Sequence, residues 1–471
     1  MSNSNYNFNW SSDITCHFSG DVLPNDALER STQARFLTSF TKKYKESSYV
    51  LNLNSDWGAG KTYFIKRWAN SIRDHHPVVY IDAWSNDFHN DPLTLVISHI
   101  IRELKKIGIN SDKALLENIV LTSCNLIKNT TFESFKGVLK KQSGIDLDNI
   151  QASYKSEKAA HELKLEGLAS DLINITEEQE SAVKQFKLAV SSFLDEIITE
   201  KNSDNKNRWS PLYIFVDELD RCRPTFAIET LEVIKHIFSI KKVIFIVATD
   251  SKQLEHSIKV IYGSGFDSKK YLERFFNRSF TLIKPDLSSF IAIQEGFTDI
   301  VESLKKTNSF ELVEWTDDSV LHFISALFNC LSLDLRTTSQ IIDRTSSIIN
   351  FNDGCIGTIW LIFLESIRSY DSDIYTLLIN GKIRTDDATF HSALLDNVKS
   401  RIGNHALLNS SVLIGDGKYT FSSLLVYMAR VYSKEVNVMR DEPKLLEIYL
   451  DKTNLGQNEI SNLMNLSAGI S

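Results

Sequence analysis

The sequence predicts an α/β protein in which helices cover both faces of a mainly parallel sheet, with an inserted helical arm and a C-terminal all-helical domain. The first observation is a set of apolar runs that do not alternate with polar residues, which is typical of strands buried on both faces of a parallel sheet. The second is that apolar residues at helical spacing follow these runs, and the third is a succession of helical patterns after about residue 286. The apolar runs lie at residues 49–53, 78–81, 211–216 and 243–248.

The domain organisation follows from the chain length and from the positions where these patterns change. The chain has 471 residues, of which 42% are hydrophobic, so it can bury the cores of about two to three domains. We expect a polar N-terminal segment at 1–20 and an α/β core at 21–285, with a helical insertion at about 92–206. A C-terminal helical domain is expected at 286–471.

The first strand run ends in a glycine-containing loop that opens onto a helix. This loop reads Ser55-Asp56-Trp57-Gly58-Ala59-Gly60-Lys61-Thr62. It fits the pattern GxxxxGK[ST], except that Ser55 occupies the first glycine position. In this pattern backbone N–H groups surround a β-phosphate, the lysine reaches the β- and γ-oxygens, and the hydroxyl binds Mg²⁺. The expected nucleotide contacts are Ser55, Asp56, Trp57, Gly58, Ala59, Gly60, Lys61, Thr62 and Tyr63.

The third strand run ends in two carboxylates, Asp217 and Glu218. Because ligands gather at the carboxyl ends of parallel strands, we interpret Asp217 as a Mg²⁺ ligand together with Thr62. Glu218 is placed to orient or deprotonate an attacking water, so we expect Glu218 and Lys61 to be catalytic. The alternative is a solvated acidic strand end, which the loop about 155 residues upstream makes the weaker interpretation. Loop and strand end together predict a P-loop NTPase αβα sandwich.

Three other charged residues allow more than one interpretation. Asp250 ends a later strand, where a polar side chain can sense a γ-phosphate, but aspartate is also a frequent helix N-cap. Arg274 is the expected arginine finger, which would act on the γ-phosphate of a neighbouring subunit. A structural ion pair is the alternative for any single arginine. For Arg221 we expect a salt bridge to Asp220 or to a nearby helix.

Taken together, these motifs resemble the KAP family of P-loop NTPases over roughly residues 21–345. The sequence departs from the family pattern at Ser55, and at Asp82, where the family commonly has asparagine. The most specific shared element is the run that follows the third strand. The shared residues are Gly58-Ala59-Gly60-Lys61-Thr62 after a tryptophan, Asp82-Ala83-Trp84, Asp217-Glu218-Leu219-Asp220-Arg221-Cys222-Arg223-Pro224, Val247-Ala248-Thr249-Asp250, Tyr271-Leu272-Glu273-Arg274 and Phe280-Thr281-Leu282.

The resemblance implies ATP and Mg²⁺ as cofactors, ATP rather than GTP as the substrate, and hydrolysis as the reaction. It also implies that Arg336, in the segment Leu333-Asp334-Leu335-Arg336, reads the phosphate state of the nucleotide, with a helix-capping ion pair as the alternative. A bacterial or phage-related setting, with a role in antiviral defence, is a further implication of this kinship.

Many members of the family carry transmembrane helices between the two nucleotide-binding motifs, but this chain has no apolar window of the roughly 18 to 20 residues that a spanning helix needs. The region from about 145 to 206 has charged, amphipathic helical patterns instead. This region forms either a projecting arm or helices packed on the sheet. An arm, together with the C-terminal helices, would serve self-association or the binding of a partner or effector protein.

The charge and the cysteine content restrict the remaining classes of function and location. The formal net charge of −8 argues against broad binding of nucleic acid, which requires a basic face, so only a local basic groove remains open. The five cysteines are scattered without the paired spacing of a zinc site or a disulfide framework. The N-terminal residues lack the features of a signal peptide. We therefore expect a cytoplasmic protein without a membrane anchor.

Three functions remain in competition. The leading one is an ATP-hydrolysing switch or regulator that acts on a partner protein. The second is a nucleotide-dependent assembly scaffold with little hydrolysis, and a turnover measurement separates it from the first. The third is a nucleic-acid-stimulated ATPase, whose stimulation would weaken as the salt concentration rises.

Overall fold

The chain forms two compact units, Met1–Ile283 and Lys284–Ser471. The computed structural model describes residues 6–88, 91–107, 113–127, 135–137, 139–140, 145, 168–203, 211–283, 286–307, 316–352, 357–379, 411–414, 417–420, 464 and 466.

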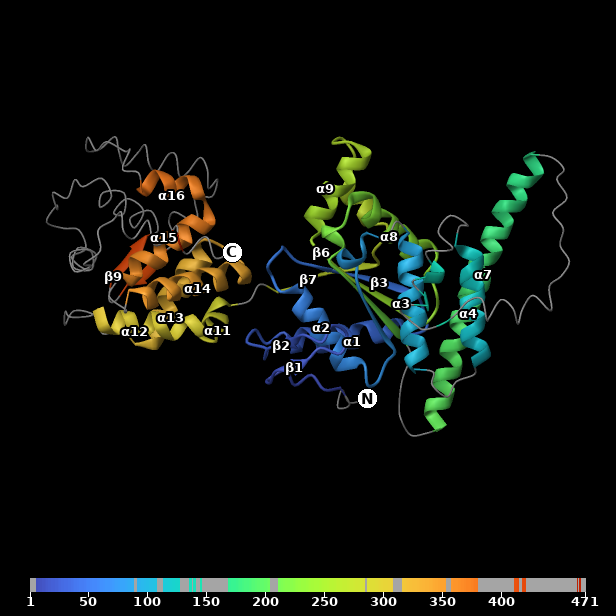
Figure 1. Ribbon diagram of the computed structural model, residues 1–471, viewed down its shortest axis with the longest axis horizontal. Coiled ribbons are helices and arrows are strands. Elements are labelled where there is room, and N and C mark those ends of the chain that lie inside the picture. The colour runs from blue at the N-terminus through green and yellow to red at the C-terminus, as the bar shows by residue number, and fades with distance from the viewer. Residues whose placement is uncertain are drawn as a thin grey trace. The chain divides into compact units, whose positions relative to one another are not determined.

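A parallel sheet forms the centre of the first unit (Figure 1). Within the described residues it has five strands in the order β4, β5, β6, β3 and β7, and each neighbouring pair is parallel. The predicted α/β fold is therefore confirmed. The strands are β3 (Tyr49–Asn54), β4 (Val78–Asp82), β5 (Leu212–Asp217), β6 (Val243–Thr249) and β7 (Arg278–Thr281).

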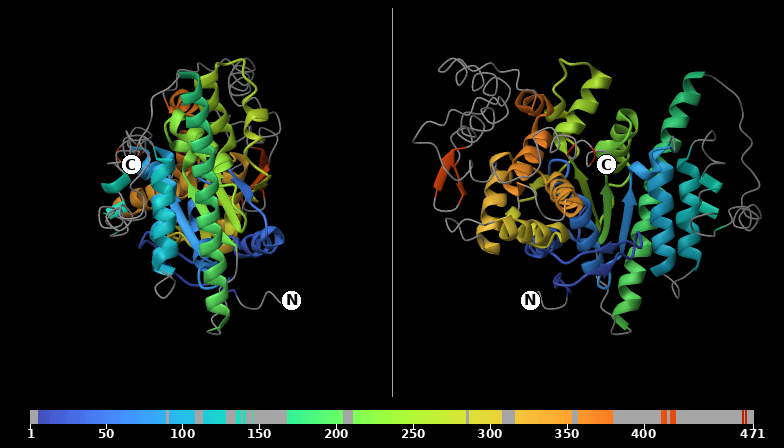
Figure 2. Two further views of the ribbon diagram at one scale, coloured as in Figure 1. Left: turned by 90° about the vertical axis from the view of Figure 1, so that its right-hand side faces the viewer. Right: turned by 60° about the vertical axis from the view of Figure 1, so that its left-hand side comes forward.

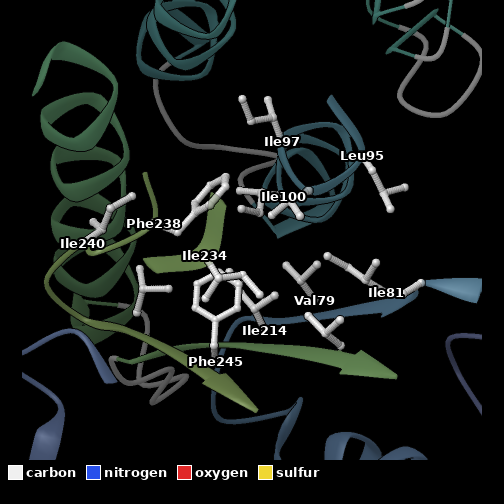
Figure 3. Packing of buried hydrophobic residues seen from close by; sticks show 14 of the residues in the cluster. Val79, Ile81, Leu95, Ile97, Ile100, Ile214, Ile234, Phe238, Ile240 and Phe245 are labelled. Atoms are coloured by element: carbon white, nitrogen blue, oxygen red, sulfur yellow. The ribbon is translucent and has the colours of Figure 1, made fainter. Parts of the chain in front are cut away.

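The two faces of the sheet belong to separate hydrophobic clusters, because successive side chains of a strand point to opposite faces. On one face, Tyr213 and Phe215 of β5 pack with Trp68 of α2 (Lys61–Ile72). The Trp68 ring meets that of Phe215 edge-on, with 5.2 Å between the ring centroids. On the other face, Ile214 and Phe245 lie beneath the apolar side chains of α3 (Pro92–Ile107) (Figure 3). The remaining helices of this unit are α1 (Ser31–Thr41), α2 (Lys61–Ile72), α8 (Pro224–His236), α9 (Ser251–Tyr262) and α10 (Ser268–Leu272), with 3-10 turns at Lys42–Tyr44, Trp84–Asn86 and Leu219–Arg221.

Between β4 and β5, helix α3 packs on the second face of the sheet, α4 (Lys113–Leu126) packs on α3, and α7 (Leu168–Ser203) packs along α4. Helix α7 runs past the ends of the other two (Figures 1 and 2). Phe186 of α7 is buried against Phe238, with 5.7 Å between ring centroids, and Phe193 is buried in the same cluster. Of the region from about 145 to 206, the structure describes residue 145 and α7, and α7 packs along α4. Within those residues, no helix is long and apolar enough to cross a membrane.

The N-terminal segment packs against α2. It contains a short antiparallel pair, β1 (Ile14–Thr15) and β2 (Val22–Leu23), and the indole of Trp10 donates a hydrogen bond to the Ser71 hydroxyl at 2.8 Å. The guanidinium of Arg67, which is buried, donates to backbone carbonyls of this segment.

The second unit is mainly helical, as the fold class predicted. Within it, Glu365 is fully buried and forms an ion pair of 2.9 Å with Arg344. A short antiparallel ribbon, which the sequence analysis did not predict, follows the helices. The elements are α11 (Leu287–Ala292), α12 (Glu295–Thr307), α13 (Asp317–Cys330), α14 (Leu335–Phe351), α15 (Thr358–Tyr370), α16 (Ser372–Ile379), β8 (Ser411–Ile414) and β9 (Gly417–Thr420).

Candidate nucleotide-binding site

The loop between β3 and α2 has the backbone conformation that its glycines allow. Gly58 and Gly60 have φ angles of 76° and 79°, in the left-handed region that residues with a Cβ rarely adopt. The N–H of Ser55 donates to the Thr249 carbonyl of β6 at 3.1 Å, which fixes the start of the loop. Helix α2 begins at Lys61 with Gly60 as its N-cap residue, so its first N–H groups lack intrahelical partners.

Lys61 points back into the loop that precedes it. Its Nζ donates to the carbonyls of Ser55 (2.5 Å) and Asp56 (3.1 Å), and the residue is 8% exposed. Burial lowers the pKa of the ammonium, while the carboxylates of Asp220, Asp250 and Asp217 act in the opposite direction. The cation therefore lies among acidic groups but donates to neutral carbonyl oxygens.

The two predicted metal ligands lie together. Asp217 is buried at the end of β5, and its carboxylate accepts hydrogen bonds from the Thr62 side chain, from the Tyr80 hydroxyl (2.9 Å) and from the N–H of Glu218 (2.9 Å). Burial raises the pKa of Asp217 to about 6, although the hydrogen bonds from Tyr80 and Thr62 lower it.

A cation at this position would need oxygen ligands from outside the protein. Among the described residues there is no group of three or more histidine, cysteine or carboxylate side chains that would hold a metal by itself. Thr62 and Asp217 fit a Mg²⁺ ion that also binds phosphate oxygens and water, because Mg²⁺ commonly keeps several waters and takes few protein ligands.

Glu218 follows Asp217 in a left-handed backbone conformation, with φ of 56°. Its Oε1 forms an ion pair with Nη1 of Arg221 at 2.7 Å, and the Arg221 guanidinium lies over the Trp84 ring at 5.5 Å. Burial raises the pKa of Glu218, and Arg221 lowers it. The expected partner Asp220 instead accepts a hydrogen bond of 2.5 Å from the indole of Trp57, so the structure corrects the pairing of Arg221.

Two other loop residues use their side chains away from the centre of the loop. The Tyr63 hydroxyl donates to the Pro24 carbonyl at 2.9 Å, which leaves the backbone N–H of Tyr63 as its group for a phosphate. Asp56 forms an exposed ion pair with Lys252 at 3.2 Å.

Asp250 is the N-cap of α9. Its carboxylate accepts from the N–H groups of Lys252 (3.0 Å) and Gln253 (3.4 Å), which is the structural alternative named above. Arg274 is exposed after α10, and Arg336 is exposed in the first turn of α14 in the second unit. A role for either arginine toward a bound phosphate stays a prediction.

Sequence reasoning missed two residues of this site. Tyr80 lies two residues before Asp82 on β4, so it shares a sheet face with Asp217 on the neighbouring strand, and the strand register would have revealed it. Arg30 is buried against the loop, where its guanidinium donates to the Gly60 carbonyl at 3.2 Å. No local pattern marks Arg30, because the contact is made only when the N-terminal segment folds over α2.

A parallel sheet with a left-handed glycine loop, a buried lysine at the start of the following helix and a buried aspartate at a neighbouring strand end defines a P-loop nucleotide-binding protein. The family profile described as "KAP family P-loop domain" matches residues 32–362, and the chain belongs to this family.

Among solved structures, the chain is similar to the ORC2 protein of Aeropyrum pernix. The complexes with ADPNP and ADP share 11% identity at a TM-score of 0.32, over 96% of this chain and 97% of that chain. The ADP form shares 13% identity at a TM-score of 0.31, over 93% of each chain. Likenesses of this size carry no functional argument. The search of curated proteins gives no match.

Proposed function

We propose that this protein is a Mg²⁺-dependent ATPase whose nucleotide state switches its interaction with a partner protein. The hydrogen bond between the Thr62 side chain and the buried Asp217 carboxylate carries the proposal, because it joins the two expected metal ligands beside Glu218. Asp217 and Thr62 would hold the Mg²⁺ ion, which supplies charge neutralisation at the phosphate oxygens when it is bound.

Lys61 is suited to receive the phosphates. Its ammonium donates hydrogen bonds to the carbonyl oxygens of Ser55 and Asp56, so moving it to a phosphate oxygen leaves no buried anion without a partner. The N–H groups at the start of α2 and the positive end of its dipole favour the same anion.

Glu218 is the proposed group that orients the attacking water and accepts its proton. One observation favours the scaffold with little hydrolysis as a second candidate: the Glu218 carboxylate is already engaged by Arg221 at 2.7 Å. A carboxylate held in this pair must share its oxygens with the water, which slows turnover unless the pair rearranges.

The partner and the setting are the parts of the proposal that rest on kinship. Self-association, or an effector protein that contacts the inserted helices or the C-terminal helices, would read the nucleotide state. Antiviral defence is the proposed setting and the cytoplasm the proposed location, and the described cysteines Cys16, Cys124 and Cys222 are free thiols. Loss of protection against phage on Lys61→Ala, in cells that express the protein with its neighbours, would test the setting.

The central test measures steady-state phosphate release with ATP and Mg²⁺ over a range of protein concentrations. We expect Lys61→Ala to lose ATP binding, and Glu218→Gln to keep ATP bound while turnover falls by about 10² to 10⁴. The exposed residues Lys269 and Glu229 provide matched controls as Lys269→Ala and Glu229→Gln, which should behave as wild type.

The outcomes separate the candidates. Turnover that rises with protein concentration and is lost in Glu218→Gln supports an ATPase that a neighbouring subunit completes. ATP binding without turnover in the wild type supports the scaffold. Full activity in both Lys61→Ala and Glu218→Gln would refute the assignment of the site.

A further inference from the structure

Two arginines are buried where the N-terminal segment covers α2, and each has two guanidinium nitrogens, Nε and Nη1 in Arg67, without a hydrogen-bond partner among the described residues; they differ in the carbonyls that they contact. Arg67 donates through Nη2 to the carbonyls of Ser12 (2.8 Å) and Leu23 (2.9 Å), so it fastens this segment to the helix. Arg30 is 1% exposed and donates through Nη1 to the Gly60 carbonyl, while its Nε and Nη2 have no hydrogen-bond partner among the described residues. A buried guanidinium with so few acceptors is uncommon, because a buried donor without an acceptor has lost its hydrogen bonds to water.

The chain before Arg30 is shaped to hold this side chain inside. Glu29 has a φ angle of 51°, a left-handed conformation that is strained for a residue with a Cβ. The Asp26 carboxylate accepts hydrogen bonds from the N–H groups of Leu28 (3.2 Å) and Ser31 (2.8 Å), and these bonds hold the turn between Asp26 and Ser31. Burial lowers the pKa of Arg30 and the charge of Asp26 opposes that effect, but a guanidinium stays protonated in proteins.

The contact at Gly60 reaches the phosphate-binding face of the loop through one peptide group. The Gly60 carbonyl and the Lys61 N–H belong to the same planar peptide, so in the trans form they point in opposite directions. The carbonyl also accepts the N–H of Phe64 at 3.1 Å, the first hydrogen bond of α2. The Lys61 N–H lies at the first position of the helix, where N–H groups have no intrahelical acceptor.

We propose that Arg30 is a positioning residue for the nucleotide, which fixes the Gly60–Lys61 peptide and strengthens the Lys61 N–H as a donor to a β-phosphate. This inference rests on the proposed function of the site. A charged donor on a carbonyl polarises its peptide, and hydrogen bonds in such a chain strengthen one another by perhaps 10–30%. The guanidinium of Arg30 lies beside the N-terminus of α2, where its charge opposes the positive end of the helix dipole. A bound phosphate is attracted by the guanidinium and by the helix N-terminus, and so compensates for their repulsion.

The test compares Arg30→Lys, Arg30→Gln and Arg30→Ala in the full chain. The matched control is Arg35→Ala, at an exposed position of α1, the helix that begins directly after Arg30. The dissociation constants of a fluorescent ADP and of a non-hydrolysable ATP analogue are measured with Mg²⁺, and the thermal midpoint is measured without nucleotide. We expect Arg30→Ala to weaken both ligands about tenfold, in keeping with a charge-assisted hydrogen bond. Lysine should restore most of the affinity and glutamine little of it, while Arg35→Ala binds as wild type.

A purely structural role would lower the thermal midpoint of the Arg30 variants and leave their dissociation constants unchanged once folded, and that result would overturn the inference. Equal affinities of the lysine and glutamine variants would also overturn it, and this pair keeps the test valid if Arg30→Ala does not fold. If neither the wild type nor Lys61→Ala binds nucleotide, the proposed function itself fails. If binding is lost in Lys61→Ala but kept in all Arg30 variants, only the role of Arg30 fails.

Discussion

Asp217 should destabilise the nucleotide-free protein when it is ionised, and Asp217→Asn should therefore be more stable than the wild type at neutral pH. The carboxylate is buried at the end of β5 and its pKa is raised from 3.8 to about 6. An asparagine of nearly the same shape can still accept from the Glu218 N–H through its single oxygen, and its amide N–H can donate to the Tyr80 hydroxyl oxygen.

The size of the effect follows from the two pKa values. A difference of about 2 pKa units corresponds to about 3 kcal/mol, at about 1.4 kcal/mol per unit. Because the folded-state pKa of Asp217 is the higher one, the unfolded chain releases this proton first. The wild type accordingly loses stability as the pH rises from about 4 to about 6, and the loss is constant above that range. At pH 8, Asp217→Asn should unfold at a temperature higher by about 5 to 10 °C.

The assay is thermal unfolding of both proteins between pH 5 and pH 8 without nucleotide. Asp82→Asn is the matched control, because Asp82 lies beside Asp217 in the register of β4 and β5. Mg²⁺ with nucleotide should then stabilise the wild type more than Asp217→Asn, since only the wild type keeps the carboxylate. A variant no more stable than the wild type at pH 8, or a difference that does not change between pH 5 and pH 8, would refute this reasoning.

Two further substitutions test the loop and the cap. Asp250→Ala should lower the free energy of unfolding by about 1 kcal/mol in urea, because α9 loses its N-cap, while Asp250→Asn should cost much less; equal losses would contradict a capping role. Gly60→Ala should cost about 1–2 kcal/mol through its φ of 79°, and should weaken nucleotide binding beyond that loss, which titration of the folded variant with fluorescent ADP measures. Unchanged affinity of Gly60→Ala for ADP would show that nucleotide binding does not need the left-handed conformation of residue 60.

The sheet and the loop could be predicted from the sequence because their signals are local. A strand buried on both faces needs apolar residues throughout, and the turn from β3 into α2 needs glycine at two left-handed positions. Asp217 and Thr62 could be placed together because the carboxyl ends of parallel strands meet at one edge of the sheet.

The features that the sequence did not predict depend on which residues meet in the folded chain. Arg221 was expected to pair with Asp220 or with a nearby helix, but after the 3-10 turn at Leu219–Arg221 it pairs with Glu218, and Asp220 accepts a hydrogen bond from Trp57. Arg30 is 30 residues from the carbonyl that it contacts, and periodicity carries no information on such a pair. The packing of the inserted helices likewise depended on buried contacts such as Phe186 with Phe238, which an amphipathic pattern does not specify.

The charged run after β5 connects separate parts of the site, which gives a physical reason for its sequence. Asp217 joins β4 and α2 through Tyr80 and Thr62, and Asp220 holds the indole of Trp57 in the loop. Arg221 then links Glu218 to the aromatic ring that follows β4. Because Glu218 and Arg221 pair with each other, substituting either one leaves an unpaired charge at the site. Substituting Asp217 or Asp220 instead removes the acceptor of the Tyr80 hydroxyl or of the Trp57 indole, and this changes the surroundings of the carboxylate proposed to activate water.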